Sequence, residues 1–210
     1  MRMLAAAACL CLLAGCPPMH HGGDDTLPDL ALVPADLRRC DPHPDNLLQN
    51  PSFEQGGGSA HNTGQPPSSI PAWDGCCNLE GQGLTTTWQV TNTAAHCGAQ
   101  SVLVRSIAAR GDVLNQELTV TDGAGRSFGL TAQVLLREAS PGAQLQLDLF
   151  DRQAGRVLRA SAPLSTPGPS WVELSVLGQL PGGAAPRVQA RLLSSGTLTA
   201  LLDDVTLLLR

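Results

Sequence analysis

The chain of 210 residues contains no lysine and no tyrosine, and aromatic residues make up only 3% of it. Its formal net charge is -5, so it offers no basic surface for nucleic acid, and nucleic-acid binding is not expected. The 22 glycines and 16 prolines favour many short elements joined by turns over long helices. These features are typical of a sandwich of β-sheets.

Sequence motifs of the common catalytic sites are absent as well. The chain has no Gly-x-Ser-x-Gly, no His-Glu-x-x-His and no phosphate-binding loop. Only five glutamates occur, and no pair of carboxylates stands in a context that predicts the acid and nucleophile of a glycosidase. We therefore predict that the protein is not an enzyme.

The first sixteen residues have the character of an export signal. Arg2 precedes a short apolar run over 3–13, which is far below the roughly 20 residues that span a bilayer. The run ends in Leu-Ala-Gly-Cys16, which resembles the bacterial lipobox. The resemblance implies cleavage before Cys16 and a lipid on its thiol, and Pro17 rather than Asp after it favours the outer membrane. The alternative is an ordinary signal peptide that happens to end in Gly-Cys.

Residues 17–45 resemble a disordered tether, since they are rich in Pro, Gly and Asp and have no periodic apolar pattern. The pair His20-His21 lacks further ligands at a fixed spacing, so we expect solvated linker there and not a metal site. The tether predicts that the folded domain begins at residue 46.

Four cysteines remain in the mature chain after the lipidated one: Cys40, Cys76, Cys77 and Cys97. Export places them in an oxidising compartment, where disulfides are expected. A bond between the adjacent pair would be strained, so we predict that Cys40 and Cys97 each pair with one of them. A zinc site is the weaker alternative, because adjacent cysteines lack the usual spacer.

Beyond residue 45 the apolar residues recur with a period of two, as in Leu145, Leu147 and Leu149. Turn sequences such as Ser140-Pro141-Gly142 separate these runs. We predict a two-sheet antiparallel β-sandwich, with an irregular connection over 55–84. The expected strands are 46–53, 86–92, 100–106, 113–121, 126–137, 143–151, 156–162, 170–177, 186–193 and 199–209.

Several stretches together resemble the CenC-type carbohydrate-binding modules, which are galactose-binding-like jelly rolls. The opening Asn46-Leu-Leu-Gln-Asn-Pro-Ser-Phe-Glu-Gln-Gly56 and the closing Leu201-Leu-Asp-Asp-Val205 carry the most specific similarity. Pro71-Ala-Trp73, His96-Cys-Gly-Ala-Gln-Ser-Val102 and the runs 116–120 and 128–132 extend it over most of 46–210. The resemblance implies a jelly roll for 46–210 that binds an oligo- or polysaccharide.

The family often carries a structural calcium between its first and last strands. The resemblance places its carboxylates at Glu54 and Asp203, with carbonyls near Asn50 and after Trp73. Calcium takes six to eight oxygen ligands, so two acids brought together by strand pairing make chemical sense. The alternative is that these acids are simply exposed surface residues.

Sugars stack on exposed aromatic rings while neighbouring polar side chains bind their hydroxyls. Phe53, Phe128 and Trp171 lie in pattern with core positions, and Trp73 matches a position that is usually structural. Trp88 is therefore the candidate stacking residue. Gln133, where the family commonly has an aromatic, is the second candidate ligand-binding residue.

The leading hypothesis is a lipid-anchored envelope protein that binds a glycan. A structural or protein-interaction domain is the rival, and an accessory subunit that delivers a separate hydrolase is a third possibility. Exposure of Trp88 beside the loop 55–84 would favour glycan binding. Burial of all three tryptophans would favour the interaction domain.

Overall fold

The computed structural model describes residues 43–56, 61–62, 70–74 and 85–210. All of them belong to the second of the two units into which the chain divides, Leu32–Arg210. Every regular element among these residues is a strand, and none of them forms a helix able to cross a membrane. The predicted leader and nearly all of the predicted tether lie outside the described residues.

The strands are antiparallel throughout, and β3 and β8 stand next to each other at the centre of their order. The order is β1-β2-β3-β8-β4-β7, and β5 joins β8 to β6. The strands are β1 (His61–Asn62), β2 (Thr85–Thr91), β3 (Ser101–Thr119), β4 (Ser127–Ala139), β5 (Gln144–Asp151), β6 (Arg156–Ala160), β7 (Val172–Gln179) and β8 (Arg187–Leu209).

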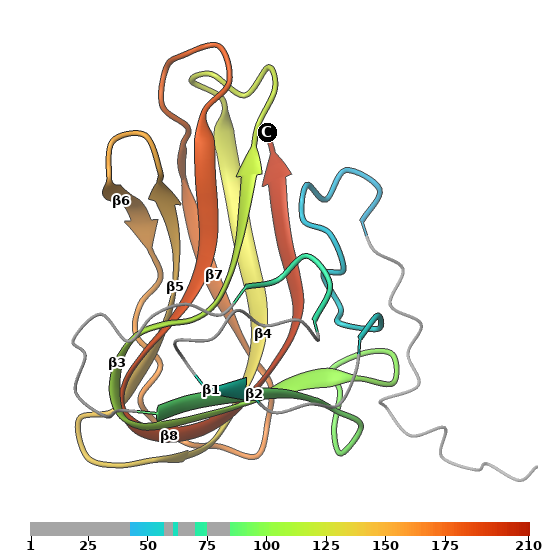
Figure 1. The fold of residues 1–210 in the computed structure, drawn as a ribbon, viewed down its shortest axis with the longest axis vertical. Coiled ribbons are helices and arrows are strands. Elements are labelled where there is room, and N and C mark those ends of the chain that lie inside the picture. The colour runs from blue at the N-terminus through green and yellow to red at the C-terminus, as the bar shows by residue number, and fades with distance from the viewer. Residues whose placement is uncertain (1–42, 57–60, 63–69, 75–84) are drawn as a thin grey trace, which may run out of the picture. The chain divides into compact units, whose positions relative to one another are not determined.

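The two long strands β3 and β8 pair along their length and pass together from one layer to the other (Figure 1). Residues 102–106 of β3 pair with 198–202 of β8, and with β1, β2, β4 and β7 they form layer A. Residues 109–119 pair with 187–196, and with β5 and β6 they form layer B. The pairing is irregular between Ser106 and Ala109, where the strands bend.

One hydrophobic core joins the two layers. In β5, the alternation of buried Leu145, Leu147 and Leu149 is the predicted period of two. The core also contains Val102, Val104, Leu114, Trp88, Phe128, Leu130, Val134, Leu174, Val188, Leu192, Leu202 and Leu207. The predicted antiparallel β-sandwich is therefore confirmed.

Two predictions of separate strands are wrong. The ranges 100–106 and 113–121 belong to one strand, β3, and the ranges 186–193 and 199–209 belong to one strand, β8. The reason is that the chain bends at these places without breaking its ladder. Gly196 makes the bend in β8 with a φ of 76°, which is accessible to glycine at little cost. The predicted irregular connection 55–84 contains the short strand β1, which pairs with β2.

The segment predicted as the first strand, 46–53, is not a strand. Asn50 and Phe53 have φ values of 45° and 58°, which lie outside the extended region. The segment is held by single bonds instead, such as those from Leu47 N to Leu207 O and from Val205 N to Pro51 O, both 2.9 Å. The side chain of Gln116 also binds both the N–H and the carbonyl of Gln49.

Substituting Gly196→Ala is expected to destabilise the fold by about 2–3 kcal/mol. A left-handed φ costs about 1–2 kcal/mol, and the new Cβ would also lie 2.9 Å from the Cα and Cβ of Ala143. Gly142→Ala is the matched control, because Gly142 has a φ of 80° but open space around it, and should cost about 1 kcal/mol. Urea unfolding compares the two. If both variants lose the same free energy of unfolding, the contact between the new Cβ and Ala143 adds no cost.

Candidate functional site

A grid of polar and aromatic side chains covers the outer face of layer B. Residues directly opposite each other in antiparallel strands point to the same side, and their neighbours Leu147, Leu149 and Ala190 point into the core. The strand register therefore places three rows of three on the opposite side. This layer B face consists of Asn115, Arg191 and Asp148; Glu117, Gln189 and Phe150; and Thr119, Arg187 and Arg152. The exposed Asp74 extends the first row, because it lies opposite Asn115 at the edge of the layer.

A buried ion pair stands in the first row. Arg191 donates from Nε to Asp148 Oδ1 at 2.8 Å and from Nη2 to Oδ2 at 2.6 Å. The guanidinium carbon also lies 4.0 Å from the centroid of the Phe150 ring. A two-bond fork and a ring contact together fix all three side chains. Phe150 is half-buried, so part of its ring stays accessible.

Two amide side chains lie beside this pair. Gln189 donates from Nε2 to Asn115 Oδ1 at 2.6 Å. The Nδ2 group of Asn115 is buried and has no hydrogen-bond partner. A buried donor without a partner is unfavourable by about 1–3 kcal/mol, and such groups call for a specific explanation. An acceptor supplied by a buried water molecule would satisfy it.

Glu117 in the second row is held by two arginines. Arg152 Nε donates to Oε2 at 3.0 Å, and Arg187 Nη2 donates to Oε1. Burial alone would raise the pKa of Glu117, but the two guanidinium groups lower it below its usual value. Glu117 and Asp148 are thus both paired with arginines. The face offers hydrogen bonds and a ring, which is the chemistry of binding.

A second polar cluster surrounds the acids of the closing motif. Between Thr131–Thr206 and Gln133–Asp203, β8 contains one residue more than β4, which forms a bulge. Asp204 lies in this bulge with a φ of 47°. The bulge places the side chains of Asp203 and Asp204 against the loop 92–100.

Three carboxylates hold that loop through its backbone and one ring. Asp203 Oδ2 accepts the N–H groups of His96 and Cys97 at 2.8 and 3.2 Å, and Oδ1 accepts that of Asp204. Glu54 Oε1 accepts the N–H groups of residues 99 and 100 at 2.9 and 3.0 Å. His96 Nδ1 lies 2.6 Å from Asp204 Oδ2. Asp203 is completely buried, and burial together with the charge of Asp204 raises its pKa to about 7.

Glu54 and Asp203, the predicted calcium ligands, both accept hydrogen bonds from the backbone. Both oxygens of Asp203 accept N–H groups. Glu54 likewise spends one oxygen on two amides. Within the described residues, the acids bind the loop directly, and calcium remains a sequence-based prediction.

His96, Cys97 and Asp204 also bring three potential metal ligands within 4.8 Å of one another. Cys97 is disulfide-bonded, so its sulfur is no thiolate for a metal. Its Sγ lies 2.8 and 2.9 Å from the oxygens of Asp204 as a contact. Cys16, Cys40, Cys76 and Cys77 lie outside the described residues, and the predicted pairing stays a prediction.

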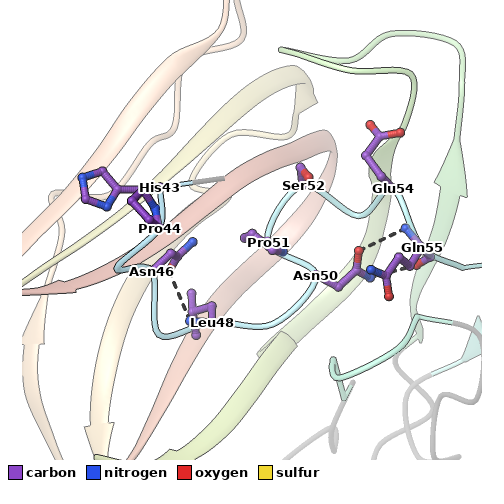
Figure 2. A pocket seen from close by; sticks show the side chains of 9 residues that line it. All are labelled: His43, Pro44, Asn46, Leu48, Asn50, Pro51, Ser52, Glu54 and Gln55. Carbon is purple, nitrogen blue, oxygen red and sulfur yellow. Dashed lines mark hydrogen bonds between the residues drawn. The ribbon is translucent and has the colours of Figure 1, made fainter. Parts of the chain in front are cut away.

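A pocket of 490 Å³ lies along the opening segment and is lined by residues between His43 and Gln55 (Figure 2). The polar side chains that line it form hydrogen bonds with the backbone of the same loop. Asn50 donates to Gln55 O at 2.8 Å and accepts from Gln55 N at 3.1 Å. Asn46 Oδ1 accepts from Leu48 N. This pocket is therefore part of the loop's internal structure.

The prediction that a sugar stacks on Trp88 is wrong, because this ring is fully buried in the core. Gln133 lies on the outward side of β4, where it contacts Glu173 at 3.4 Å, so it shares no site with Trp88. Trp73 is buried too, whereas Trp171 is half-buried and meets His96 edge-on, with 5.7 Å between ring centroids.

Sequence reasoning missed the layer B face. The information was nevertheless present in β5, because three inward leucines at alternate positions force Asp148 and Phe150 to point outward. The partners from β3 and β8 could not be found this way, since they depend on the register between distant strands.

Comparison with known proteins supports the fold. No protein-family model and no curated protein matches the chain. The C-terminal family 22 carbohydrate-binding module of Clostridium thermocellum Xyn10B aligns with a TM-score of 0.52 and 15% identity, over 80% of this chain and 96% of the module. The CBM22-1 xylan-binding domain of Paenibacillus barcinonensis Xyn10C aligns with a TM-score of 0.46 and 19% identity, over 73% and 96%. The chain has the jelly-roll fold of carbohydrate-binding modules, as the sequence predicts.

The buried Asp203 should make stability fall as the pH rises. Its pKa is about 7 in the folded chain against 3.8 ordinarily, so between these values the folded state keeps a proton that the unfolded state releases. The free energy of unfolding should drop across this window by up to about 4 kcal/mol. Asp203→Asn cannot ionise and should flatten this dependence.

Urea unfolding at several pH values between 4 and 8 measures the slope. Asp122→Asn is the control, because Asp122 is exposed in a turn with a φ of 56°, which asparagine tolerates. An unchanged slope in Asp203→Asn would contradict the assignment to this carboxyl group.

Proposed function

We propose that the chain is a non-catalytic, exported lipoprotein whose β-sandwich binds a glycan on the layer B face. The observation that carries this proposal is the half-buried Phe150 ring, held by Arg191, one row from the exposed guanidinium groups of Arg152 and Arg187. An accessible apolar ring next to fixed hydrogen-bonding groups is what the two sides of a sugar require.

The rigidity of these side chains supports the proposal. Arg191 is fixed by Asp148, and Gln189 by Asn115, so the groups would lose little freedom when a ligand binds. The jelly-roll fold adds a framework on which sugar binding is common, although a fold alone does not define a ligand.

A glycan array and a pull-down on insoluble polysaccharides, performed with the full chain, test the proposal. Phe150→Ala should reduce retention about tenfold or more, because it removes the ring. Leu177→Ala is the matched control, since Leu177 is 59% exposed on β7 in layer A. Thermal unfolding confirms that both variants fold. Retention on no glycan, or retention that Phe150→Ala leaves unchanged, would favour the protein-interaction domain.

Export and lipidation are proposed from the leader alone. Arg2, the apolar run 3–13 and the Leu-Ala-Gly-Cys16 ending support a lipid anchor at Cys16, and Pro17 favours the outer membrane. Cys16→Ala should move the protein from the detergent phase to the aqueous phase in a phase-partition assay. Cys11→Ala, a change within the leader, should not. Detergent partitioning that survives Cys16→Ala would refute the anchor.

A further inference from the structure

Three arginines stand on the layer B face, and two of them, Arg152 and Arg187, lie together in its third row. These two share one carboxylate, Glu117, whereas the exposed carboxylate of Asp74 lies opposite Asn115 in the first row. A ligand at the third row therefore meets mainly the unused donors of Arg152 and Arg187.

Two of these guanidinium groups have donors to spare. Arg152 and Arg187 have side-chain exposures of 45% and 56%, and each contributes one nitrogen to Glu117. A guanidinium has five N–H donors, so most of them remain directed at solvent. Arg191 differs, because Asp148 takes two of its nitrogens and it is only 11% exposed.

The two exposed arginines are neighbours. Arg152 N donates to Arg187 O at 2.9 Å, which places both residues in the third row of the face. Phe150 and Gln189 stand one row away, two residues along their strands, or roughly 7 Å. A sugar stacked on the ring could therefore present a substituent to the two arginines.

We propose that the glycan bound on the layer B face bears carboxylate groups, as uronic acids do, and that Arg152 and Arg187 bind them. This inference rests on the proposed glycan binding. The planar fork of arginine matches a carboxylate in two parallel hydrogen bonds, and a second guanidinium strengthens the attraction. Glu117 accepts a hydrogen bond from each arginine, which orients both side chains and leaves their remaining donors free.

Two pairs of polysaccharides that differ in carboxylate content test the inference with the full chain: polygalacturonate with its fully methyl-esterified form, and glucuronoxylan with unsubstituted xylan. We expect at least one carboxylated polymer to bind about tenfold more tightly than its neutral counterpart in affinity electrophoresis. Arg187→Gln should remove most of this preference, and Arg187→Lys should restore only part of it, because lysine keeps the charge without the fork.

Arg126→Gln is the matched control, since Arg126 is exposed in a turn outside the layer B face. Equal binding of both members of each pair would overturn this inference and leave glycan binding intact. Dextran sulfate bound as tightly as the carboxylated polymers would overturn the carboxylate preference. Binding to none of the four polymers would also overturn it, whereas retention of the chain on another glycan of the array would preserve the proposed function.

Discussion

The structure depends on the continuous ladder between β3 and β8. These two strands pair from one layer into the other, so their bend sets how the layers face each other. β5 builds layer B on the first part of β8, and β4 builds layer A on its second part. The bend needs Gly196, where a side chain would meet Ala143. This single ladder runs through both layers, which share one core.

The same ladder assembles the candidate site. Arg191 stands opposite Asn115 on one side and Asp148 on the other, because β8 is paired with β3 and β5 at once. A slip of one residue would turn these charged groups into the core and expose leucines, so the hydrophobic pattern that fixes the register also fixes the site. The precision of the ion pair and the amide pair thus follows from core packing.

The period of two in the sequence was enough to predict the strands and the sandwich, since it depends only on which side of a sheet is buried. It could not predict that two strands run through a bend, because a bend interrupts the alternation as a turn does. The strand predicted for the opening segment is absent for another reason. Its apolar residues are buried by turns in which Asn50 and Phe53 have positive φ. Residue type alone favours Trp88 as a sugar-stacking ring, but it is buried, whereas the alternation of β5 predicts that Phe150 points outward.

Four acids in the two polar clusters of the described residues are used internally. Asp203 and Glu54 bind the N–H groups of the loop 92–100, and Asp148 and Glu117 bind arginines. In the first region the donors are backbone groups, so the carboxylates are satisfied and little is left for a ligand. In the second region each guanidinium has more donors than its acid can accept. At the third row of the layer B face, the groups left for a partner are therefore mainly donors, and the Phe150 ring lies one row away.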